Sequence, residues 1–181
     1  MPTFFGQQTQ TSTDTLNSAG ILYFTAVSFT CPGSGSQNIQ ELSVFCHANG
    51  TNAQVRLGIY NSTGTTLIAE GTSAVALTGS SLAWQGHMSQ AAVKAAGGAS
   101  PGVLVGGTNY ILAAAFSTAN GNGVLGMTTG GTSDNYKLQD SSGGMPASLP
   151  SPDGAAGYRS AIRASVDPAA APADLMGQIC M

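Results

Sequence analysis

Charged residues are scarce in this sequence: 7% of its 181 positions are Asp, Glu, Lys or Arg, whereas about a quarter is typical of a soluble domain. Only five residues are basic, and the formal net charge is -3. Nucleic-acid binding requires clustered Lys and Arg that neutralise phosphates, so the composition excludes that function. A surface rich in Gly, Ser, Thr, Asn and Ala gives little electrostatic repulsion between copies, which favours a protein whose surface is covered by partners.

Cysteine and histidine are also few, with three and two residues. Cys31, Cys46 and Cys180 form an odd, widely spaced set without a CxxC unit, so we expect reduced, buried thiols rather than a disulfide scaffold. A zinc site needs four Cys or His ligands at close spacing, and we predict neither a metal nor a cofactor. Calcium stays an alternative at Asp134-Asn135 and Asp140, although EF-hand spacing is lacking.

No group of residues forms a recognisable catalytic constellation. His47 follows Cys46 on one expected strand, where neighbouring side chains point to opposite faces and do not form a nucleophile–base pair. His87 lies near Trp84 on a strand that we expect to pack on a core. The acidic residues fall mostly in expected loops and arms and define no carboxylate pair. We therefore predict a non-enzymatic protein, with a hydrolase as the remote alternative.

Long apolar runs are missing as well. No stretch approaches the length that spans a bilayer, and the amino terminus lacks the basic and apolar regions of a signal peptide. The sequence therefore predicts neither Sec-dependent export nor membrane insertion, and we expect the protein to be made and assembled in a cytoplasm.

What the sequence does contain is a series of strand signals separated by turn residues. The length and a hydrophobic content of 42% fit a single domain with its own core. Only Gln90–Gly98 has a pattern that permits a helical turn. The expected strands are Ile21–Thr30, Ile39–Cys46, Ala53–Tyr60, Thr65–Gly71, Ala74–Leu77, Leu82–Met88, Thr108–Thr118, Gly123–Thr128, Asn135–Leu138 and Tyr158–Val166. This pattern predicts an all-β fold, an antiparallel β-sandwich over residues 21–166.

Alternation along two of these strands predicts which side chains face the core. In Ala53–Tyr60, apolar residues at every second position indicate a half-buried strand whose Arg56 and Tyr60 face away from Val55, Leu57 and Ile59. In Tyr158–Val166, the same alternation puts Arg159 and Arg163 on the solvent or partner face. Residues 1–20, rich in Thr, Gln and Ser, and residues 167–181, rich in Ala and Pro, are predicted to be extended N- and C-terminal arms.

Three segments together resemble a known family: Val55–Asn61 with the following Thr63-Gly64-Thr65, Leu104–Ala113, and Gly144–Pro150. They are similar to the jelly-roll, carbohydrate-binding-module-like β-sandwich of tailed-bacteriophage virion proteins, which include capsid decoration or cement proteins and tail-associated modules. The resemblance implies a jelly-roll-like fold and a place on the capsid surface. Its implied partners are the major capsid protein and copies of the chain itself, in a dimer or trimer.

The arms carry the residues that we expect to bind such partners through strand addition and apolar contacts. The alternative is that these residues pack on their own domain. The predicted anchors are Phe4, Phe5, Leu175, Met176 and Ile179.

A second hypothesis is a carbohydrate- or receptor-binding module of a phage tail or a bacterial surface. Sugar-binding relatives of this fold present aromatic rings on an exposed face, and the candidates here are Tyr60, Trp84 and Tyr136. Trp84 is the sole tryptophan, which weighs against lectin activity. Burial of these rings would favour the cement hypothesis.

Overall fold

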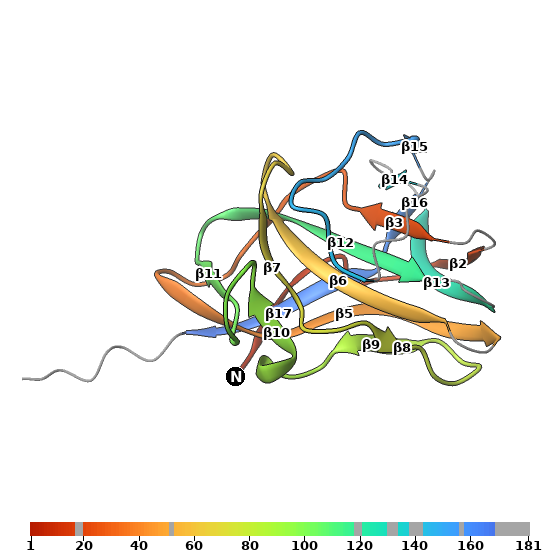
Figure 1. The fold of residues 1–181 in the computed structure, drawn as a ribbon, viewed down its shortest axis with the longest axis horizontal. Coiled ribbons are helices and arrows are strands. Elements are labelled where there is room, and N and C mark those ends of the chain that lie inside the picture. Colours follow the sequence, from red (N-terminus) through yellow and green to blue (C-terminus); the bar gives the residue numbers. More distant parts are fainter. Residues whose placement is uncertain are drawn as a thin grey trace, which may run out of the picture.

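The computed structural model describes residues 1–16, 20–50, 53–117, 121–129, 134–137, 143–155 and 158–168. These residues form two antiparallel sheets packed against each other (Figure 1). The predicted all-β sandwich is therefore confirmed. Where a helical turn was expected, the chain forms a single short 3-10 helix, η1 (Gln90–Ala92), and then continues at once into a strand.

The first sheet, here called sheet A, has the order β1-β17-β5-β13-β16, with β9 and β11 also paired to β5 and β2 paired to β13. The predicted N-terminal arm belongs to this sheet, because β1 pairs with β17 and β2 with β13. The expected strand Tyr158–Val166 is divided in two at Ala161. The strands are β1 (Thr3–Gly6), β2 (Ser12–Leu16), β5 (Ser36–Gly50), β9 (Ala83–His87), β11 (Val103–Val105), β13 (Gly121–Thr129), β16 (Tyr158–Ser160) and β17 (Ile162–Pro168).

The second sheet, sheet B, has the order β10-β7-β6-β12-β3-β14-β15, with β4 paired to β12 and β8 to β6. Strand β12 lies at its centre, between β6 and β3. The strands are β3 (Ile21–Phe24), β4 (Phe29–Thr30), β6 (Gln54–Asn61), β7 (Leu67–Gly71), β8 (Val75–Ala76), β10 (Val93–Ala95), β12 (Asn109–Ser117), β14 (Asn135–Lys137) and β15 (Gly154–Ala155).

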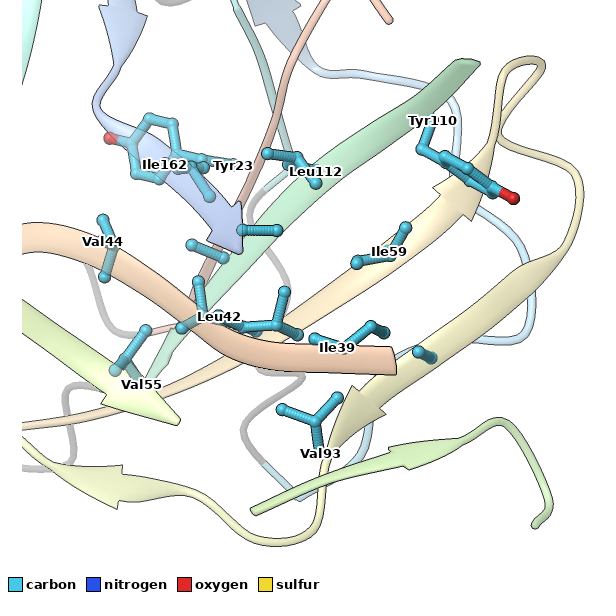
Figure 2. Close-up of a cluster of buried hydrophobic side chains, with 14 of the residues drawn as sticks. Tyr23, Ile39, Leu42, Val44, Val55, Ile59, Val93, Tyr110, Leu112 and Ile162 are labelled. Atoms are coloured by element: carbon cyan, nitrogen blue, oxygen red, sulfur yellow. The ribbon is translucent and has the colours of Figure 1, made fainter. Parts of the chain in front are cut away.

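The main core fills the space between the two sheets. Figure 2 shows Ile39, Leu42 and Val44 of β5 opposite Ile59 of β6 and Leu112 of β12. Every second residue of a regular strand points to the same face, so each of these strands contributes a row of apolar side chains. In β5 a register shift between Ile39 and Glu41 lets Ile39 and Leu42, three positions apart, both face the core. The row of the central strand β12 consists of Tyr110, Leu112, Ala114 and Phe116.

Sheet B is also covered on its outer side, by residues 143–149, here called the strap. Leu67 donates its backbone N–H to Ala147 O at 2.8 Å, and Leu149 donates to Gly64 O at 2.7 Å. The side chains of Met145 and Leu149 pack on the outward-facing residues of β6, β7 and β12. The prediction of a half-buried strand at β6 is therefore wrong, because the strap buries its second face.

The strap and β6 fit closely because a glycine occupies the point of contact. A Cβ atom on Gly58 would lie 2.9 Å from Met145 Cε, closer than side chains normally approach. The strap contains most of one of the three segments that carry the family resemblance, β6 contains Val55–Asn61 of the second, and the third runs from β11 into β12. Strands β6 and β12 pair, and the strap lies on their outer side.

Candidate functional site

The outer face of sheet A differs from that of sheet B because its apolar side chains stay exposed. Val103 and Val105 are 44% and 54% exposed on either side of the buried Leu104, and Phe4 is 37% exposed. On sheet B, the outward-facing Tyr60 is completely buried. We call this surface the sheet A face and define it by Phe4, Glu41, Ser43, Phe45, Trp84, Val103, Val105 and Arg163.

Arg163 lies at the centre of the sheet A face. Its guanidinium carbon is 4.3 Å from the ring centroid of Phe4 and 3.9 Å from that of Trp84. Its Nη2 lies 2.9 Å from Glu41 Oε1, and its Nε donates to Ser43 Oγ at 3.1 Å. Three strands, β1, β5 and β9, therefore supply the groups around the side chain of Arg163, which itself lies on β17.

The strand registers explain this assembly. Arg163 pairs with Ser43, which pairs on its other side with Gly86, two positions from Trp84. Phe4 pairs with Ser165, two positions from Arg163 on β17. Since residues two apart share a face, all of these side chains project from sheet A in the same direction.

The electrostatics make this face nearly neutral. Arg163 and Glu41 compensate each other, and their side chains are only 17% and 14% exposed. A cation over an aromatic ring contributes about 0.5–2 kcal/mol, more when water is excluded. The face thus presents rings and valines to a partner rather than a net charge, and it can be covered without burying an unpaired ion.

The structure separates the predicted N-terminal anchors. Phe4 lies on the sheet A face, whereas Phe5 is 6% exposed and packs in the core of its own domain. The alternation of β1 explains the difference, since neighbouring residues point to opposite faces. The remaining anchors lie outside the described residues; they are Leu175, Met176 and Ile179.

The three candidate ligand-face aromatics do not share a surface. Trp84 is half-buried on the sheet A face, with Phe45 at 5.2 Å between ring centroids. Tyr60 lies under the strap, where its hydroxyl donates to Pro146 O at 2.7 Å and burial raises its pKa. Tyr136, half-buried on β14, packs against the main core.

Sequence reasoning missed the pairing of Arg163 with Glu41 and the exposed valines of β11. The alternation of the last strand did indicate that Arg163 faces outward. Its carboxylate partner lies 122 positions away in the sequence, and no local pattern connects them. The triplet Val103-Leu104-Val105 was a possible strand signal, but it is only three residues long.

A second group of charged residues lies beneath the strap. Arg56 Nη1 donates to Gly143 O at 2.7 Å, and Glu70 Oε2 accepts the Met145 N–H at 3.1 Å. Lys94 Nζ lies 3.3 Å from Glu70 Oε1. These groups use their hydrogen bonds to hold the strap on sheet B, so we assign them a structural role.

Two more buried titratable groups link parts of the core. His87 Nε2 accepts the Leu57 N–H at 3.4 Å, and burial, assisted by the Arg56 charge, lowers the His87 pKa to about 4. Asp134 accepts the N–H groups of Ser160 (2.7 Å) and Ala26 (3.3 Å). Burial raises the Asp134 pKa to about 6, although both hydrogen bonds oppose the shift.

The thiols that the structure describes are free and buried. Burial raises the pKa of Cys31 to about 11 and that of Cys46 to about 12, so neither is ionised at neutral pH. The prediction of reduced, buried thiols is confirmed for these two, while Cys180 lies outside the described residues. His47 Nδ1 lies 2.7 Å from Ala48 O, which identifies it as a donor to the backbone.

The described part of the chain brings no three His, Cys, Asp or Glu residues together as metal ligands. Nor does it contain a helix that is long and apolar enough to cross a membrane. The sequence matches no known protein-family model, and no curated protein is significantly similar to it. The sheet A face is therefore the feature from which we argue function.

Proposed function

We propose that this protein is a non-enzymatic virion structural protein, a capsid decoration or cement protein of a tailed bacteriophage. In this role it binds the major capsid protein and further copies of itself on the outer surface of the capsid. The observation that supports the proposal is the sheet A face, which is apolar, internally charge-compensated and open. The family resemblance of β6, β12 and the strap points to the same class.

The chemistry of the face suits a lattice of closely packed subunits. Covering apolar surface stabilises a complex by about 25 cal/mol per Å², and a stable interface buries about 1,200–2,000 Å² in total. The pairing of Arg163 with Glu41 lowers the desolvation penalty of such an interface. The low overall charge further reduces repulsion between neighbouring copies.

Co-sedimentation with capsid shells assembled from the major capsid protein of the same virus tests the proposal. We expect the full chain to sediment with the shells and Val105→Lys to lose most of the binding, because the lysine would be desolvated in the interface. The matched control is Thr63→Lys, at an exposed turn of sheet B, which should bind normally. A wild-type chain that never sediments with shells contradicts the proposed function, and equal binding by Val105→Lys contradicts the assignment of the face.

A second candidate is a carbohydrate- or receptor-binding module, favoured by one observation. Trp84 lies half-buried on the open sheet A face, and an aromatic ring on an open face can stack against a sugar ring. Arg163 already covers the Trp84 ring, which reduces the aromatic area left for stacking. Glycan-array binding by the full chain that Trp84→Ala abolishes, without capsid binding, would establish this alternative.

A further inference from the structure

The end of β17 lies beside the apolar part of the sheet A face. Asp167 pairs with Asn38 of β5, and Asn38 pairs on its other side with Val103 of β11. The last residue of β17, Pro168, pairs with Gln37. Figure 1 shows this end of β17 at the same end of the molecule as β11.

Exposed apolar side chains surround this position on both sides. Val103 and Val105 lie across β5, and the fully exposed Met1 lies on the other side, where its nitrogen is 3.9 Å from Asp167 Oδ1. Phe4 lies on β1, where it pairs with Ser165, two positions before Asp167 on β17. Exposed apolar side chains of the β1 edge and of β11 therefore flank the polar pair Asp167 and Asn38 at this end of sheet A, and exposed apolar side chains of this kind indicate a binding surface.

The chain that continues from this position is also largely apolar. Residues 169–181 contain one charged residue, Asp174, and four large apolar residues, Leu175, Met176, Ile179 and Met181. In an extended segment, residues 175 and 179 project from the same side. Thirteen residues span up to about 43 Å when extended, which is ample to cross the face of one sandwich sheet.

The direction of β17 favours a second copy as the acceptor. The strand runs from Ile162, which pairs with Val44, to Pro168, which pairs with Gln37, and it therefore leads away from Trp84. To reach Phe4 of its own face, which pairs with Ser165, the chain would have to reverse directly after Pro168. A segment that continues in the direction of β17 instead leaves its own domain.

We propose that residues 169–181 of one copy dock on the sheet A face of a neighbouring copy. Leu175 and Ile179 supply the apolar contacts, and the exposed side chains of Phe4, Val103 and Val105 receive them. The inference extends the proposed assembly role by naming the segment that joins adjacent copies, and it rests on that role. Its test requires no capsid, so its failure and that of the proposed function are separate results.

The experiment uses two full-length chains and the native thiol of Cys180. One chain carries Val105→Cys with Cys180→Ser, and the other is wild type. The chains are mixed under mild oxidation, and the disulfide-linked heterodimer is measured on non-reducing gels and located by mass spectrometry. The control chain carries Ser62→Cys with Cys180→Ser, which puts the thiol at an exposed turn of sheet B.

We expect roughly tenfold more heterodimer with Val105→Cys than with Ser62→Cys, because docking raises the effective concentration of the tail thiol at the face. Introducing Leu175→Ser and Ile179→Ser into the Cys180 chain should remove this excess. Equal yields at positions 105 and 62 would overturn the proposal, since they indicate random collision. A single chain with Val105→Cys and native Cys180 that forms only an intramolecular disulfide would overturn it as well.

Discussion

The two buried titratable groups, His87 and Asp134, should affect the pH dependence of stability in opposite directions. The native pKa of His87, about 4, lies below its unfolded value of 6.5. As pH falls from 6.5 to 4, the unfolded chain binds a proton that the native chain does not, and the free energy of unfolding decreases by about 3 kcal/mol. This stabilising contribution is fully present above pH 6.5.

Asp134 has the opposite effect. Its native pKa of about 6 lies above the unfolded value of 3.8, so the native chain holds a proton that the unfolded chain releases in this range. The free energy of unfolding therefore decreases by about 3 kcal/mol as pH rises from 3.8 to 6.

Single substitutions should reveal each contribution. Between pH 4 and pH 6 the two contributions nearly cancel in wild type. In Asp134→Asn, the free energy of unfolding should instead rise by about 3 kcal/mol over this range. His87→Gln, whose amide oxygen replaces Nε2 as acceptor for Leu57, should make it fall by a similar amount. Urea denaturation at closely spaced pH values measures both. Variants whose pH profiles run parallel to that of wild type would refute the reasoning.

Three further predictions concern the strap and the sheet A face. Arg56 Nη1 lies 3.9 Å from Glu70 Oε2, and both side chains are nearly buried. Arg56→Ala should therefore lower the free energy of unfolding by about 3 kcal/mol in urea denaturation, because it removes one partner of this buried ion pair, whereas the more exposed Lys94→Ala should cost less than about 1 kcal/mol. Gly58→Val should displace the strap and make it the first site of limited proteolysis; a strap as resistant as in wild type would contradict the close fit. Arg163→Ala should shift the emission of Trp84, the sole tryptophan, to longer wavelength as water reaches its ring, and an unchanged spectrum would contradict the stacked geometry.

Local sequence patterns were sufficient for the fold class and for most of the strands. Alternating apolar residues and turn clusters predicted β6 and β12 closely. Strands β1, β2, β10, β11 and β15 were missed. Four of them have two to four residues and are too short for a period of two to be recognised, and the five-residue β2 lies in the polar segment that was predicted to be an arm.

The sequence by itself determined an all-β chain of low charge, because period-two patterning and composition are local properties. Only the tertiary structure decided which faces are covered. Alternation showed that Tyr60 and Arg163 each point away from the core side of their strands, yet one is buried under the strap and the other lies on the open sheet A face. The reason is that burial of an outward face depends on a segment distant in sequence: the strap residue Pro146, which accepts the Tyr60 hydrogen bond, is 86 positions away.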